Sequence, residues 1–126
     1  MRTKLGTFRY PIELLYADGS RSETLHPWVD TGALYSQFPA GLLEALGYHP
    51  HATRRFRLAD GTTTDLPVGE VRVRLNEEVT TVLCVFAEET ADPLIGATTL
   101  ENFSLAVDPV NETLTPTVAM RLTRQS

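Results

Sequence analysis

The sequence predicts an all-β sandwich or barrel with one or two short helices. Short alternating or apolar runs recur along the chain, and turn-forming Gly, Asp, Asn and Pro residues separate them. Leucines at helical spacing stand out in one short segment, residues 39–47, which has a proline near its start and Gly47 at its end. At 126 residues the chain is expected to form a single domain, residues 1–126.

Before the helix, the chain is expected to contain a hairpin and a short apolar strand. Residues 8–16 are predicted to form the first strand, residues 17–20 a turn, and residues 21–25 the returning strand. Trp28 and Val29 then form an apolar run that ends at Asp30.

After the helix, β signals dominate. Asp60 and Gly61 mark a tight turn between two alternating segments, and Asn76 begins another turn. The expected elements are strands at 54–59, 62–67, 69–75 and 79–87, an apolar run at 94–96, a helical turn at 98–103, a strand at 105–107, and one or two strands within 113–122.

Composition and charge exclude several function classes. The formal net charge of −5 disfavours nucleic acid and anionic membrane surfaces as partners, because both select basic faces. Cys84 is the only cysteine, and its apolar neighbours predict a small buried side chain. An N-terminal apolar segment and an apolar run of bilayer length are both absent, so we expect a cytoplasmic protein with no membrane partner.

Familiar catalytic and metal motifs are missing. The histidines, at 26, 49 and 51, have no Cys, His or carboxylate partner at a metal-binding spacing, so neither a metal site nor a cofactor is expected. No serine lies in a Gly-x-Ser-x-Gly elbow, and no glycine-rich phosphate loop occurs.

The sequence Asp30-Thr31-Gly32 remains as the feature that can carry chemistry. Asp, Thr and Gly are all turn residues, so the motif by itself is explained by an Asx turn that closes the strand. A carboxylate positioned for catalysis is the other explanation. The motif alone favours the turn, so the choice depends on the other motifs of the chain.

Three stretches in order give the chain a resemblance to the retropepsin-like aspartic proteases. "WVDTGALYSQFPAGLLEALGY" resembles the active-site strand, loop and following helix of that family. "RLADGTTTDLPVGEVRV" resembles its flap hairpin, and "PLIGATTLENFSLAVDPVNETLTP" resembles its second half-loop, helix and closing strands. The resemblance runs from about residue 8 to about residue 116 and implies an acid-protease β-barrel with one or two short helices.

The same resemblance implies roles for individual residues and an aspartic endopeptidase activity. The implied catalytic residues are Asp30, Thr31 and Gly32, and the implied substrate-binding residues are Ala33, Asp60, Gly61, Thr62 and Ile95. Family members hydrolyse peptide bonds with two aspartates, whereas this chain has one Asp-Thr-Gly. The resemblance therefore implies a homodimer that acts on peptide or unfolded protein.

Two departures from the retroviral pattern leave an alternative open. The hairpin has one glycine followed by three threonines instead of a glycine-rich tip, and Ala97 and Thr98 stand where an Arg that braces the dimer is expected. The bracing is then expected in the terminal segments, residues 1–8 and 118–124. The alternative is a catalytically inactive module of the same fold that binds peptides or mediates dimerisation. A small β-domain that binds a metal or cofactor has no ligand cluster to support it.

Overall fold

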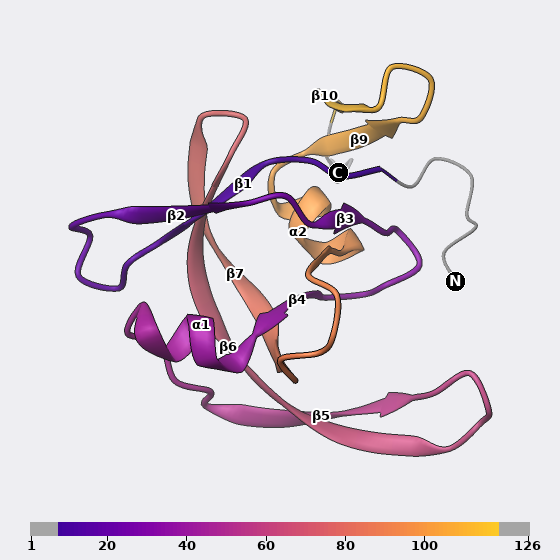
Figure 1. Ribbon diagram of the computed structural model, residues 1–126. Coiled ribbons are helices and arrows are strands. Elements are labelled where there is room, and N and C mark those ends of the chain that lie inside the picture. Colours follow the sequence, from indigo (N-terminus) through magenta and orange to yellow (C-terminus); the bar gives the residue numbers. More distant parts are fainter. Residues whose placement is uncertain (1–7, 119–126) are drawn as a thin grey trace, which may run out of the picture.

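The computed structural model describes residues 8–118, and the expected all-β class is confirmed (Figure 1). Two short helices accompany the strands, as the sequence predicts. In chain order the elements are β1 (Ile12–Leu15), β2 (Ser22–Leu25), β3 (Trp28–Val29), β4 (Ser36–Pro39), α1 (Ala40–Ala45), β5 (Ala52–Arg57), β6 (Thr63–Leu75), β7 (Glu78–Ala87), β8 (Leu94–Ile95), α2 (Ala97–Asn102), β9 (Leu105–Asp108) and β10 (Thr113–Pro116). The terminal segments expected to brace a dimer lie almost wholly outside the described residues.

One eight-stranded sheet organises the chain. Its order is β2-β1-β6-β7-β4-β8-β3, and β5 pairs with the other end of β6. Most neighbours are antiparallel, but β4 pairs parallel with β7, and β3 pairs parallel with β8. The parallel β3–β8 pair joins segments far apart in the sequence, and it places the loop after Val29 beside the loop after Ile95. Strands β9 and β10 form a separate antiparallel hairpin.

Strand β6 is longer than the sequence predicts. Two strands were expected, at 62–67 and 69–75, from their alternating patterns. The structure has one continuous strand that changes partner at Val68, which pairs with Ala52 of β5 and with Val85 of β7. A Cβ at Gly69 would lie 2.9 Å from the His49 carbonyl oxygen, so glycine allows the backbones to approach closely at this change of partner.

The first predicted strand is shorter than expected because the chain changes partner at Pro11. Residues before Pro11 pair with the β3 segment: the Val29 N–H donates to the Phe8 carbonyl at 2.8 Å, and Arg9 bridges Trp28. Residues after it form β1, which pairs with β2 and β6. The extended segment at 8–16 therefore holds β3 from one side before it enters the sheet.

The expected turns are confirmed, and positive φ angles explain their residue types. Gly19 (φ 77°) turns the β1–β2 hairpin, and Gly47 (φ 102°) follows the end of α1. Asn76 (φ 50°) and Glu77 (φ 70°) both adopt the left-handed conformation in the two-residue turn between β6 and β7. That pattern of two positive φ angles suits the twist of a tight hairpin.

The main core lies between the sheet and the two helices. Its fully buried side chains include Leu14, Phe38, Leu43, Val71, Val73 and Ile95. A second, smaller cluster lies under the β5–β6 hairpin, where Val68, Val85 and Ala87 are covered by Phe56 and Leu66. Within residues 8–118, no helix has the length and apolar character that a membrane span requires.

Candidate active site

Asp30 stands at the end of β3 on the loop that leads to β4. Its backbone N–H donates to the Ile95 carbonyl at 3.0 Å, which extends the β3–β8 pairing by one residue. Its carboxylate Oδ1 accepts a hydrogen bond from the Gly32 N–H at 2.9 Å, and its carbonyl accepts one from the Ala33 N–H at 3.1 Å. The loop is an Asx turn and also fixes the position of the carboxylate.

The N-terminus of α2 binds the backbone of the same loop. The first N–H groups of a helix have no partner within the helix. Here the Ala97 N–H donates to the Ala33 carbonyl at 2.8 Å, and the Thr98 N–H donates to the Leu34 carbonyl at 2.9 Å. The loop after Asp30 and the start of α2 therefore satisfy each other's backbone groups.

Gly96 makes this contact possible by having no side chain. A Cβ at this position would lie 2.5 Å from the carbonyl carbon and oxygen of Tyr35 and 2.9 Å from the Ala33 oxygen. The φ of Gly96 is −98°, which any residue adopts, so the requirement for glycine comes from space and not from backbone conformation. The sequence Leu94-Ile95-Gly96 thus supports the Asp30 loop directly.

A buried pair of hydroxyl groups completes the support, and sequence reasoning missed it. Ser36 Oγ and Thr99 Oγ1 lie 2.6 Å apart, and both side chains are fully buried. Ser36 Oγ also accepts a hydrogen bond from the Gly96 N–H at 3.0 Å. The alternation of the strand is the available signal: Ser36 shares the buried face of β4 with Phe38, where a hydroxyl requires a partner.

The tip of the β5–β6 hairpin contains the three residues predicted to form the flap tip. Asp60 Oδ1 accepts hydrogen bonds from both the N–H (2.9 Å) and the hydroxyl (2.6 Å) of Thr62. These bonds, the side-chain one first, lower the pKa of Asp60 from its ordinary value of 3.8. Gly61 has a φ of 90°, and the Leu58 N–H donates to the Thr62 carbonyl at 2.7 Å. Asp60 therefore shapes the turn in which it stands.

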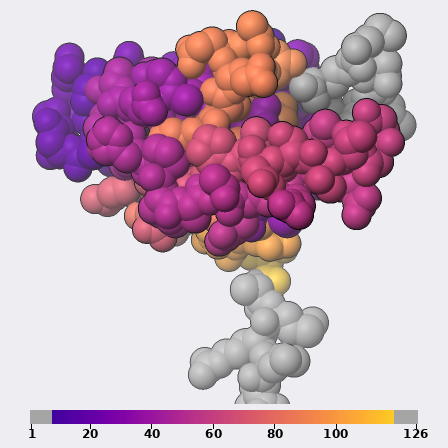
Figure 2. Space-filling model, turned by 90° about the horizontal axis from the view of Figure 1, so that it is seen from below, coloured from indigo at the N-terminus to yellow at the C-terminus, as the bar shows by residue number. Residues whose placement is uncertain are grey.

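An aromatic contact links the hairpin to the Asp30 loop. Tyr35, at the end of that loop, packs edge-on against Phe56 of β5, with ring centroids 6.0 Å apart. Figure 2 shows the face on which the hairpin runs across the molecule. The inner side chains of the hairpin pack on the second cluster, so the hairpin covers the sheet at Val68, Val85 and Ala87.

The predicted site residues differ in how far they are exposed to solvent, and so to a ligand. Asp30 and Ala33 are half-buried, whereas Thr31, Gly32 and the hairpin tip are exposed. Ile95 was expected to contact substrate, and this expectation is corrected because its side chain is fully buried in the main core. Ile95 instead supports the loop from beneath through its backbone carbonyl.

Comparison with known proteins identifies the fold. No protein-family model matches the sequence, and a search of curated proteins finds no match. Among solved structures, the chain is similar to the solution structure of Simian Foamy Virus (mac) protease, with a TM-score of 0.51 and 15% sequence identity. The match covers 75% of this chain and 94% of that chain. The chain has the retropepsin-like fold.

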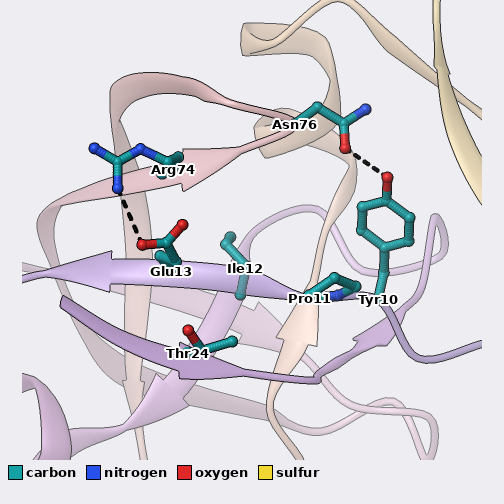
Figure 3. A pocket seen from close by; sticks show the side chains of 7 residues that line it. All are labelled: Tyr10, Pro11, Ile12, Glu13, Thr24, Arg74 and Asn76. Atoms are coloured by element: carbon teal, nitrogen blue, oxygen red, sulfur yellow. Dashed lines mark hydrogen bonds and ion pairs between the residues drawn. The ribbon is translucent and has the colours of Figure 1, made fainter.

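A further pocket of this retropepsin-like fold, of about 220 Å³, contains none of the predicted site residues (Figure 3). It is lined by Tyr10, Pro11, Ile12, Glu13, Thr24, Arg74 and Asn76. Arg74 donates to Glu13 at 3.0 Å, Tyr10 donates to Asn76, and Asn76 donates to the Leu114 carbonyl at 3.2 Å. These polar groups tie β1, β6 and β10 together, so their role is structural.

Two other chemistries have little support in this retropepsin-like fold. Cys84 is fully buried, as predicted, and burial raises the pKa of its thiol, which keeps it protonated. Among the residues that the structure describes, no three His, Cys, Asp or Glu side chains are grouped so that they could hold a metal ion.

Proposed function

We propose that this protein is an aspartic endopeptidase that acts as a homodimer through paired Asp30 carboxylates. The observation that carries the proposal is the constrained Asp30 loop: its carboxylate accepts the Gly32 N–H, and the loop is held by β8, Gly96 and the start of α2. A carboxylate held on a rigid scaffold suits catalysis, because general acid–base chemistry depends on position before pKa. The retropepsin-like fold, shared with a solved protease, adds support.

Hydrolysis of a peptide bond requires a base that takes a proton from water and an acid that protonates the carbonyl oxygen. Two carboxylates about 3 Å apart do both, as aspartic proteases illustrate, because like charges so close cannot both ionise and one proton is shared. The proton then belongs to the pair, and so do its apparent pKa values.

The second carboxylate has to come from a second copy. The chain has one Asp-Thr-Gly, and the other aspartates of its turns, such as Asp18, Asp60 and Asp108, cap those turns. A two-fold axis between two Asp30 side chains supplies the pair with one self-complementary interface. In such a dimer the β5–β6 hairpin would close over an extended peptide, and the exposed Thr31 would meet its counterpart near the axis.

The test is the Asp30→Asn variant, assayed on an unfolded protein such as reduced casein at mildly acidic pH. Asn preserves the shape of the side chain and removes its ability to take a proton, so cleavage should fall about a hundredfold or more. Glu23→Gln on β2 is the matched control, because it removes one exposed acidic charge away from the site. Equal cleavage by the wild type and the Asp30 variant would overturn the proposal.

The alternative, an inactive module that binds peptides, draws only on two departures from the retroviral pattern: the threonine-rich hairpin tip and the Arg missing after Gly96. It predicts peptide binding without cleavage, and binding that Asp30→Asn leaves intact. Isothermal titration of an extended peptide into both proteins, next to the cleavage assay, separates the two functions.

A further inference from the structure

A cavity of about 420 Å³ lies between the β5–β6 hairpin and the segment that follows β7. Leu58, Thr64 and Leu66 of the hairpin form one wall. The end of β7 with the loop after it, together with Gln37 of β4, forms the other. Figure 2 shows the face on which the hairpin crosses the molecule, with the segment after β7, in orange, beside it. The cavity is large enough for the longest amino-acid side chains.

The neighbouring space under the hairpin is already filled. Tyr35 and Phe56 meet edge-on there, and Leu66 packs with Phe56 in the second cluster. Leu58, in contrast, keeps 47% of its surface exposed although it lines the cavity. An extended chain passing under the hairpin therefore has room for a large side chain at this cavity and not beneath Phe56.

The lining combines apolar walls with one acidic group. Leu58, Leu66, Ala87 and Ala91 supply the apolar surface, and Glu88 supplies a carboxyl group. Among the residues that the structure describes, no Lys or Arg lines the cavity. Within residues 8–118, no side chain or backbone group donates a hydrogen bond to the Glu88 carboxylate, so its charge is available to a ligand.

The loop that carries Glu88 is anchored by its neighbours. Glu89 accepts a hydrogen bond from the Gly41 N–H at 2.9 Å, and Gln37 donates to the Asp92 carbonyl at 2.8 Å. The Ala91 N–H donates to the Glu88 carbonyl at 3.1 Å, which closes a turn. One bond ties the loop to α1, one ties it to β4, and one closes a turn within it, so the backbone that carries Glu88 has a defined position, which favours selection by charge.

We infer that this cavity selects a substrate side chain with an aliphatic stem and a cationic end, Lys or Arg. The stem would lie along the apolar walls and the cation would approach Glu88, as long basic side chains do when they bury their methylene groups. The opposite charge also excludes Asp and Glu from the same position. This inference rests on the proposed endopeptidase function and adds its substrate class.

The test uses alanine-based extended peptides that carry Lys, norleucine or Glu at each position in turn. Norleucine has the stem of Lys without its charge, so the Lys-to-norleucine ratio of kcat/KM isolates the effect of the cation. At the position that occupies the cavity we expect Lys to exceed norleucine about two- to fivefold, the range of partly exposed ion pairs, and Glu to be poorest. Glu88→Gln should bring the ratio to about one, and Glu88→Lys should favour Glu instead.

Controls separate this inference from the function on which it rests. Glu23→Gln should keep the Lys preference, and Ala91→Leu should shift preference toward small side chains by filling the cavity. If cleavage depends on Asp30 but the Lys-to-norleucine ratio is the same in Glu88→Gln, the inference is wrong and the endopeptidase proposal stands. If no peptide is cleaved, the dissociation constants of the same peptides for Asp30→Asn give the ratio; a ratio near one again overturns the inference.

Discussion

Ser36 and Thr99, 63 positions apart in the sequence, share a 2.6 Å hydrogen bond in the fully buried space between β4 and α2. The bond orients Ser36 Oγ to accept the Gly96 N–H. Two hydroxyls with no exposure to solvent thus connect the strand after the Asp30 loop to the helix that holds this loop.

Loss of the Ser36 hydroxyl should cost more than loss of the Thr99 hydroxyl. Ser36→Ala leaves both the Gly96 N–H and the Thr99 hydroxyl without a partner, and each such buried group costs about 1–3 kcal/mol. Thr99→Val removes one side of one bond and leaves the Gly96 bond in place. Urea unfolding measures the difference, and Thr99→Ser, which keeps the hydroxyl, is the control. Equal losses in Ser36→Ala and Thr99→Val would contradict this network.

Gly96→Ala should reduce cleavage in protein that is still folded. The added Cβ would meet the Tyr35 carbonyl group at 2.5 Å, so the loop after Asp30 has to move. Gly19→Ala is the matched control: it strains a positive φ, but a Cβ there meets nothing within 4 Å and lies in the β1–β2 hairpin. Circular dichroism establishes folding, and unchanged cleavage in Gly96→Ala would argue against the loop as the active site.

Mixtures of wild-type and Asp30→Asn chains should test the shared site. If one active site needs two Asp30 carboxylates, mixed dimers are inactive, and an equal addition of the variant lowers activity per wild-type chain to about half. A larger excess lowers it further. Activity that stays constant on mixing, after chain exchange is demonstrated with labelled protein, would place a complete site in each chain.

The hairpin tip should survive mildly acidic conditions. Thr62 lowers the pKa of Asp60 below its ordinary value of 3.8. The stabilisation that this carboxylate gives to the folded hairpin is therefore present above pH 3.8, and it is lost as the pH falls through the lowered pKa of the folded state. An NMR titration should give a midpoint below 3.8, and Thr62→Val should raise it by removing the hydroxyl bond. Asp18, which binds Ser20 in the same way in another hairpin, should keep its own lowered pKa in that variant.

Tyr35 and Phe56 should be energetically coupled. Edge-on aromatic pairs contribute about 0.5–1.5 kcal/mol beyond their buried area, so a double-mutant cycle with Tyr35→Ala and Phe56→Ala should yield a coupling in that range. Hydrogen exchange of the β5–β6 amides should also accelerate in Phe56→Ala. A coupling near zero would mean that the hairpin and the Asp30 loop move independently.

Local chemistry explains what the sequence could predict. Turns are predicted at Asp30-Thr31-Gly32, Asp60-Gly61 and Asn76, because the conformational preferences of Asp, Asn and Gly act within a few positions. Each of these turns is present. The helix at 39–47 was equally readable, because leucine spacing and a terminal glycine are local signals too.

Other features depend on partners that are remote in the sequence. The sequence predicts two strands, at 62–67 and 69–75, whereas the structure has one strand that changes partner at Val68. The Ser36–Thr99 bond has no local signature, because its two hydroxyls meet only after β4 and α2 pack together. The resemblance implied a substrate-binding role for Ile95, and only its burial in the folded chain shows that the side chain supports the site and does not contact a ligand.

The dependence of the Asp30 loop on α2 gives the chain a built-in order of assembly. Among the described residues, the backbone hydrogen bonds that join the Asp30 loop to β8 and α2 come from residues 95–98, which are synthesised long after Asp30. Such contacts form slowly, because a long intervening segment has to close before they do. During synthesis, the Asp30 carboxylate thus reaches its final position only after β8 and the start of α2 have been made and have packed against its loop.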